Sequence, residues 1–422
     1  MDQGNRTRVA FGPAVPRRTA LALGLGAGAA ALGSRPATAQ GQTVKVALLA
    51  PMSGPWARQG LLMRLGADMA IDEINAGGGI KALGGAKMEL VVFDAGDSAE
   101  KAKNAAQRMV AQHPDLVGGT GAWFSSFTLA VTEVTERAEL PWLTLSYSDL
   151  ITNRGFRYVF QMAPTADEQA AKVLPTILEL AQRATGSRPT TVGLIGGNDA
   201  SATSFMRPLR ATELERNKLR AVVDETYTPP LSDATSIVQR VRSARPQFLL
   251  TLMSNVPDIK LLMDKFAEYR LAGDRLPKVS NGGAIGAPEL GQVIGRDVIE
   301  GLMGVVANWG GKGQEELSKR FTDRTGEPWL NQDSIMTYTD IMILREATER
   351  AGTADRRKVA DAMRAFDLTD GVAKLSPGGR LKFDEKGRRI GAELVIIQWQ
   401  GGRAVPVYPA SLATAEPIWP RV

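Results

Sequence analysis

VKVALLAPMSG, at residues 44–54, is the stretch that decides the fold. Val44 to Leu49 form a short apolar run, and an amphipathic stretch from about Gln59 to Asn75 follows it. A strand followed by a helix is the repeating unit of βαβ folds, whose strands pair in parallel. Gly77-Gly78-Gly79 then ends the helix, because glycine readily adopts the left-handed conformation of a helix C-terminus. The opening therefore predicts an α/β protein with a parallel sheet.

The same alternation continues in two successive series. The first has strands predicted at 88–93, 116–117 and 141–145 and helices at 99–111 and 125–139. The second begins after Phe160-Gln161, with helices at 167–182, 203–215, 236–243 and 256–269 and strands at 191–195, 221–227, 248–252 and 277–280. A final region has helices at 333–351 and 356–366 and β-rich segments at 381–383, 392–400 and 404–408. Two α/β sheets of similar size are predicted.

The first 39 residues are typical of an export signal rather than of a folded element. Arginines such as Arg17-Arg18 precede an uncharged run from Thr19 to Ser34, and Ala37-Thr38-Ala39 is a small-x-small cleavage site before Gln40. The paired arginines suggest twin-arginine export, although the Phe usual after the pair is missing. We expect cleavage after Ala39 and a periplasmic protein.

Composition excludes several classes of function. The leader holds five Arg and one Asp, so most of the formal net charge of +6 belongs to it and the remaining chain is nearly neutral. A nucleic-acid partner therefore has no electrostatic support. The chain has no Cys, which excludes disulfides, thiolate metal sites and a lipoprotein anchor. The length left after cleavage favours two domains, and no later apolar run is long enough to span a membrane.

Catalytic and cofactor motifs are missing. The single histidine, His113, precedes Pro114 at the end of a predicted helix, which is a poor position for a triad base. Gly118 to Gly121 lack the lysine of a phosphate-binding loop, and one His without Cys makes a metal site improbable. Carboxylates such as Glu133 and Glu136 are typical of a solvated helix face. We expect no enzyme activity and no cofactor.

Several strings, taken in order along the chain, resemble the leucine/isoleucine/valine-binding protein family. They are the stretch from Val44 to Pro55, Ile74-Asn75-Ala76-Gly77-Gly78, Glu133-Val134-Thr135-Glu136, Arg154-Gly155-Phe156-Arg157-Tyr158-Val159-Phe160 and Phe383-Asp384-Glu385-Lys386-Gly387. The resemblance implies a type I periplasmic-binding fold, with two Rossmann-like lobes joined by three crossovers near 161–162, 308–309 and 370–371. Lobe one would comprise residues 41–161 and 309–370, and lobe two 162–308 and 371–422.

The resemblance also implies a ligand carboxylate held by a serine at a helix start and by the loop after the next strand. The first position corresponds to Ser125, beside Ser126, where the N–H groups and dipole of a helix start attract an anion. The alternative is that one of these serines is only an N-cap. The loop corresponds to Ser146, Tyr147 and Ser148, at the carboxyl end of a strand, where open α/β sheets bind ligands; a plain turn is the alternative.

In lobe two the sequence departs from the family pattern. The acidic residue expected for a ligand ammonium is missing from Asn281-Gly282-Gly283-Ala284, and the aromatic positions fall on Ser201 and Ser254. Binding of a branched-chain amino acid is therefore not specified. Other candidate ligand contacts are Trp56, Trp123, Phe124, Asp199, Asn255 and Asn281. For the large rings, packing within their own lobe is the alternative.

These features predict a periplasmic substrate-binding protein of an ABC importer, a monomer that captures a small carboxylate-bearing solute by hinge closure and docks on an inner-membrane permease. The solute would be an amino acid or a related organic acid. A receptor for an uncharged amide or urea, and a sensory ligand-binding module, are the alternatives.

Overall fold

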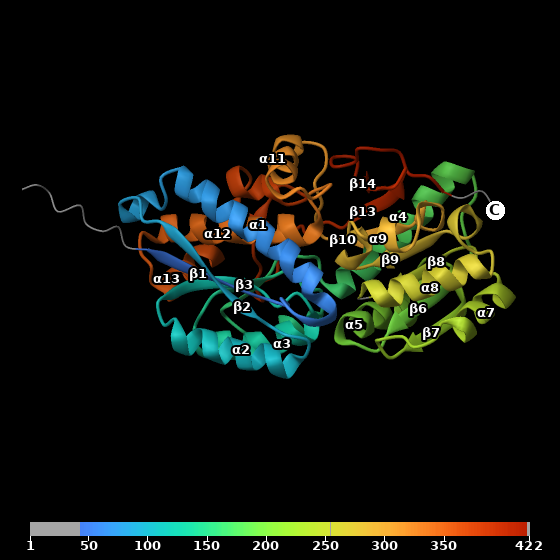
Figure 1. Cartoon of the computed structure of the whole chain (residues 1–422), viewed down its shortest axis with the longest axis horizontal. Helices are drawn as coiled ribbons and strands as arrows, with labels where there is room; N and C mark the ends of the chain where they lie inside the picture. The colour runs from blue at the N-terminus through green and yellow to red at the C-terminus, as the bar shows by residue number, and fades with distance from the viewer. Residues whose placement is uncertain (1–42, 254, 420–422) are drawn as a thin grey trace, which may run out of the picture. The chain divides into compact units, whose positions relative to one another are not determined.

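The first sheet has five parallel strands in the order β2-β1-β3-β4-β5 in the computed structural model, which describes residues 43–253 and 255–419. The strands are β1 Val44–Ala50, β2 Met88–Asp94, β3 Leu116–Gly121, β4 Trp142–Thr144 and β5 Val159–Gln161. One face is covered by α1 Ala57–Ala76, α12 Gln332–Ala351 and α13 Arg356–Arg364, and the other by α2 Ala99–Gln112 and α3 Ser125–Arg137 (Figure 1). The predicted leader, its cleavage site and Ser254 lie outside the described residues.

The second sheet has seven strands in the order β14-β13-β10-β9-β8-β6-β7. They are β6 Thr191–Gly197, β7 Arg220–Tyr227, β8 Leu249–Leu252, β9 Lys278–Asn281, β10 Met303–Val306, β13 Val395–Gln400 and β14 Arg403–Tyr408. All adjacent pairs from β10 to β7 are parallel, whereas β13 runs antiparallel to β10 and to β14. Its helices are α4 Ala166–Thr185, α5 Ala200–Pro208, α6 Leu214–Arg216, α7 Thr235–Ala244, α8 Val256–Glu268, α9 Leu290–Val293 and α10 Arg296–Ile299.

The chain passes three times between the sheets: after β5, after β10 and between α13 and β13. The second passage contains α11 Glu315–Thr325, and the third contains the short antiparallel pair β11 Asp367–Leu368 and β12 Leu381–Lys382. After β12 and before β13, the chain of the third passage lies beside β5. There the N–H of Gln161 donates to the carbonyl of Gly387 at 2.8 Å. The residue limits of the two lobes stay a prediction.

Most predicted elements are present, and the differences have physical causes. The strand predicted at 116–117 continues through its glycines to Gly121 as the central strand of the first sheet. A Cβ on Gly118 would lie 2.5 Å from Leu344 of α12, and a Cβ on Gly119 would lie 2.5 Å from Trp142 of β4. Both faces of β3 are too closely covered for side chains, so the glycines extend this strand rather than end it.

Other differences concern elements without a strong pattern. The helix predicted at 203–215 begins earlier, at Ala200, and is interrupted by a π-helical turn at Leu209–Glu213. Among the strands and α-helices, six are not predicted: β5, α9, α10, β10, α11 and β11. Five of them have only two to four residues, and α11 is a strongly polar helix. The sheets have five and seven strands, so the second is larger than predicted.

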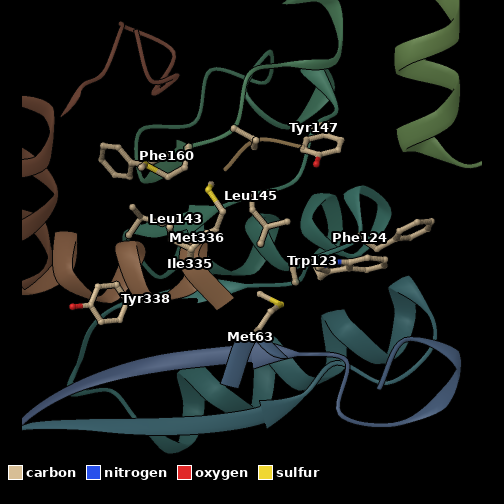
Figure 2. Packing of buried hydrophobic residues seen from close by; sticks show 14 of the residues in the cluster. Met63, Trp123, Phe124, Leu143, Leu145, Tyr147, Phe160, Ile335, Met336 and Tyr338 are labelled. Carbon is tan, nitrogen blue, oxygen red and sulfur yellow. The ribbon is translucent and has the colours of Figure 1, made fainter. Parts of the chain in front are cut away.

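Helix α12 is buried along almost its whole length between α1 and the first sheet. Gly66 of α1 allows the close approach, because a Cβ there would lie 2.1 Å from the carbonyl oxygen of Ser334. The hydroxyl of Ser334 in turn donates to the carbonyl of Leu62 at 2.7 Å. Figure 2 shows Ile335 and Met336 of this helix near Leu143 of β4, and the ring of Tyr338 pointing away from them; its hydroxyl donates to Glu73 of α1.

A buried carboxyl group lies in the same helix. Asp340 is fully buried, and its Oδ2 accepts a hydrogen bond of 2.6 Å from the hydroxyl of Thr120 on β3. Its Oδ1 has no partner among the described residues. Burial disfavours the charged form of Asp340 and raises its pKa to about 7. The hydrogen bond from Thr120 lowers the pKa, but by less than burial raises it.

This burial predicts a specific pH dependence of stability. The folded protein holds the Asp340 proton up to about pH 7, whereas the unfolded chain releases it near pH 4, so this contribution to the unfolding free energy falls as pH rises between those values. From pH 5 to pH 8 the loss should be about 2 to 3 kcal/mol. We expect Asp340→Asn to remove that part of the decline in urea unfolding curves. Asp68→Asn, on the exposed face of α1, should retain it; the same decline in all three proteins would contradict the assignment.

Candidate ligand-binding site

A cavity lies where strands of both sheets end. Its volume is about 40 Å³ in this structure, and the larger space of about 390 Å³ includes open solvent at its mouth. Its walls come from segments that follow β3, β4, β6, β8 and β9, and from the first residue of α12. The lining residues are Trp123, Phe124, Ser125, Leu145, Ser146, Tyr147, Ser201, Leu252, Met253, Gly282, Gly283, Ala284 and Gln332. The carboxyl edges of parallel strands are where open α/β folds bind ligands.

Stacked aromatic rings form one wall. Phe124 lies between two rings, with centroids 5.3 Å from Trp56 and 5.8 Å from Trp123 and interplanar angles of 24° and 17°. Figure 2 shows Trp123 and Phe124 side by side, with Leu145 and Tyr147 nearby. Trp56 does not line the cavity itself but packs behind Phe124. This wall suits a flat or branched apolar group.

The turn between β3 and α3 is strained. Ala122 and Trp123 have φ of 64° and 50°, in the left-handed region that residues with a Cβ rarely adopt. Two hydrogen bonds fix Trp123: its carbonyl accepts from the hydroxyl of Ser146 at 2.8 Å, and its indole N–H donates to Oδ1 of Asp333 at 2.9 Å. Strained backbone held by its surroundings is common at binding sites.

The start of α3 has no side-chain cap. Phe124 is the N-cap residue and its ring cannot accept a hydrogen bond, while Ser125 is the first helical residue. Neither Ser125 nor Ser126 therefore acts as the N-cap. The N–H groups of the first helical turn need acceptors, and the start of the helix lies at the cavity because Phe124 and Ser125 line it. Ser126 is half-buried and does not line the cavity.

The hydroxyls of three predicted serines, Ser125, Ser146 and Ser148, have different surroundings. Oγ of Ser125 accepts from the N–H of Ser148 at 3.3 Å and from the hydroxyl of Ser201, on α5, at 2.8 Å. The hydroxyl of Ser148 lies 2.8 Å from that of Ser204, also on α5. Ser125 and Ser146 line the cavity, whereas Ser148 does not.

A tyrosine and a glutamine connect the loop after β4 with α12. The hydroxyl of Tyr147 donates to Oε1 of Gln332 at 2.8 Å, and the N–H of Ala307 donates to the same oxygen at 2.6 Å. Burial raises the pKa of Tyr147, so this phenol stays protonated at neutral pH. Gln332 thus joins the first sheet to the end of β10 beside the cavity.

Three predicted polar contacts do not line the cavity. Asp199 is the N-cap of α5 and accepts from the N–H groups of Ser201 and Ala202. Asn255 is the N-cap of α8. Asn281 is buried at the end of β9 and donates to Oε1 of Gln169 at 2.8 Å. In this structure these side chains support elements of the second lobe.

Sequence reasoning missed part of the lining. The missed residues end or closely follow predicted strands; they are Leu145, Leu252, Met253 and the segment Gly282–Ala284. The rule that ligands bind at strand ends could therefore have identified them. Gln332 gives no such signal, because it opens a helix that is not preceded by a strand of its own sheet.

The described lining residues carry no charge. Asp333, next to Gln332, is buried, which raises the pKa of its carboxyl group to about 7 although the indole of Trp123 donates to it. Near it, Arg58 of α1 binds Glu327 and also reaches Glu289 of the second lobe, at 2.6 and 3.1 Å. The described residues contain no group of three His, Cys, Asp or Glu that could hold a metal, and no helix among them is long and apolar enough to cross a membrane.

Comparison with known proteins agrees with this architecture. The model of the family described as periplasmic binding protein matches residues 43–404. Leu/Ile/Val-binding protein homolog 7 of Brucella melitensis is 28% identical over 393 residues, covering 91% of this chain and 95% of the relative. A putative branched-chain amino acid ABC transporter structure from Silicibacter pomeroyi has a TM-score of 0.75 at 18% identity, with 90% and 99% of the chains covered. A solute-binding protein from R. palustris in complex with benzoate has a TM-score of 0.71 at 17% identity, with 90% and 99% covered.

The two α/β lobes with three crossovers are a type I periplasmic-binding fold, as the sequence predicted. The chain belongs to the periplasmic binding protein family, and it is similar to the Leu/Ile/Val-binding protein homologs. The solved structures are below 25% identity to the chain, so they define the fold and leave the solute open.

The geometry separates two of the predicted serines. Ser125→Ala removes a hydroxyl from the cavity wall beside the open start of α3 and should weaken binding of a carboxylate by about tenfold to a hundredfold, because a hydrogen bond to a charged group contributes about 1.5 to 3 kcal/mol. Ser126→Ala is the matched control, since Ser126 is the next residue of the same helix and does not line the cavity. Calorimetric titration with the solute found by screening measures both. Equal affinity in the two variants would contradict a ligand role for Ser125.

Proposed function

We propose that this protein is the periplasmic substrate-binding component of an ABC importer and that it captures a small carboxylate-bearing solute, an amino acid or a related organic acid. The observation that carries the proposal is the uncapped start of α3, which lies in a cavity between the carboxyl ends of two sheets. Orphan N–H groups and the helix dipole favour an anion there, and most of the remaining wall is apolar. No step of this function needs a bond to be made or broken.

The solute would be held between the lobes. Contacts already join them near the cavity: Ser201 donates to Ser125, Ser204 meets Ser148, and Arg58 reaches Glu289. Three crossovers can act as a hinge, and closure would bury the solute and create the surface that docks on the inner-membrane permease. Relatives named for branched-chain amino acids support this role, as does the benzoate complex.

A second solute class, uncharged amides and urea, is favoured by one observation. None of the described lining residues is charged, and hydroxyl and amide groups supply the polar contacts. The start of α3 favours the anionic class over this one, because a neutral amide gains less from a helix dipole.

A thermal-shift screen tests the proposal. Amino acids, aromatic and aliphatic carboxylic acids, amides and urea are added separately, and the melting temperature is recorded. A ligand at about 100 times its dissociation constant adds about 2.7 kcal/mol to the free energy of unfolding. We expect at least one carboxylate to stabilise the protein. Stabilisation by amides alone would replace the proposed solute class, and turnover of any bound compound would contradict a purely binding role.

Hinge closure predicts a change of size. Small-angle scattering should give a smaller radius of gyration at saturation with the solute than without it, because the two lobes would approach each other around the crossovers. The Ser125→Ala protein at the same solute concentration, too low to saturate it, is the control. An unchanged radius in the saturated protein would rule out closure on binding.

A further inference from the structure

The amide of Gln332 has a fixed orientation at the cavity wall. Its Oε1 accepts from the N–H of Ala307 at 2.6 Å, and a backbone N–H can only donate, so the atom on this side must be the oxygen. The hydroxyl of Tyr147 donates to the same oxygen. The amide nitrogen of Gln332 therefore lies on the opposite side, with both of its N–H groups available as donors.

This nitrogen lies at the part of the wall formed by the second lobe. A Cβ on Gly283 would lie 2.6 Å from Nε2 of Gln332, so only a residue without a side chain can lie this close to the amide nitrogen. Both Gly283 and Gln332 line the cavity. Among the described residues, none accepts a hydrogen bond from this nitrogen.

The cavity offers no comparable partner for a cation. Two carboxylates adjoin lining residues, and each already faces donors of the protein: Asp333 accepts from the indole of Trp123, and Asp199 accepts from the N–H groups of Ser201 and Ala202. Glu289, of the second lobe, is paired with Arg58. An ammonium group brought into this apolar space would lose its hydration without gaining a carboxylate.

We infer that the solute is an organic acid without an ammonium group, whose carboxylate lies at the start of α3 and whose second, neutral oxygen accepts a hydrogen bond from Nε2 of Gln332. Oxo and hydroxy acids with an aromatic or branched apolar body have this chemistry. The inference rests on the proposed function and makes Gln332 the residue that selects against amino acids.

The test compares ligands that share one carbon skeleton. Phenylalanine, phenylpyruvate, phenyllactate and 3-phenylpropionate form one series, and leucine with its oxo, hydroxy and unsubstituted acids forms another. Calorimetric titration gives the ratio of affinities within each series. We expect the oxo or hydroxy acid to bind about tenfold more tightly than the unsubstituted acid, which lacks one hydrogen bond, and at least a hundredfold more tightly than the amino acid.

The variant Gln332→Glu tests the residue itself. One carboxylate oxygen can still accept from Ala307 and Tyr147, while the other replaces the donor with an acceptor. The preference for oxo over amino acid should fall by about a hundredfold or more. Gln314→Glu, at another buried glutamine that does not line the cavity, should leave the ratio unchanged. Because a ratio is measured, a general loss of stability in either variant cancels.

The outcomes distinguish the inference from the proposed function. If the wild-type protein binds an amino acid as tightly as its oxo acid, the inference is wrong and the carboxylate receptor stands. An unchanged ratio in Gln332→Glu likewise overturns the role of Gln332. If no acid of either series binds and the thermal-shift screen finds only amides or urea, the proposed function fails and the inference fails with it. The ligand series on the wild-type protein decides the solute class even if a variant does not fold.

Discussion

The left-handed turn at Ala122 and Trp123 is the constraint on which the cavity depends. It ends the central strand of the first sheet and sets the direction in which α3 begins. Each residue with a Cβ in this conformation costs about 1 to 3 kcal/mol, so the turn persists only because other contacts hold it. The hydroxyl of Ser146 and the carboxyl group of Asp333 hold it, both through hydrogen bonds to Trp123. The aromatic wall and the open helix start both follow from this turn.

Helix α12 also determines the shape of the cavity. Its first turn brings Gln332 and Asp333 to the cavity, and its middle places Asp340 against β3. The close packing at Gly66 fixes the helix along its axis, because the α1 backbone meets Ser334 directly. The position of the cavity wall is therefore set by the core of the first lobe, and the site is preorganised by packing rather than by the ligand.

The sequence was sufficient for the fold and for one wall of the site. The family resemblance indicates Ser125 and Ser146 as ligand contacts, and their positions after strands agree with it; both line the cavity. The sequence does not predict the direction of each side chain, because neighbouring loop residues point to different sides. Ser146 lines the cavity, whereas the hydroxyl of Ser148 contacts Ser204 of α5. Gln332 could not be identified at all, because a tertiary crossover brings it to the cavity from about 185 residues beyond Tyr147. The sequence also suggests Asp199 and Asn255 as ligand contacts, but both are N-caps, as polar residues directly before a helix commonly are.

The wall at Gly282, Gly283 and Ala284 has an evolutionary consequence. Two of its three residues are glycines, so this wall is almost entirely backbone. Any substitution of Gly283 adds atoms toward Gln332 and makes the cavity smaller. A larger or differently shaped cavity would therefore require substitutions among the lining side chains, such as Trp123, Phe124, Leu145 or Gln332. Those positions lie on loops and at a helix start, where substitutions leave the two sheets intact. The cavity of this chain thus has one wall of backbone, which substitution of Gly283 can only narrow, and other walls of side chains, which substitution can reshape.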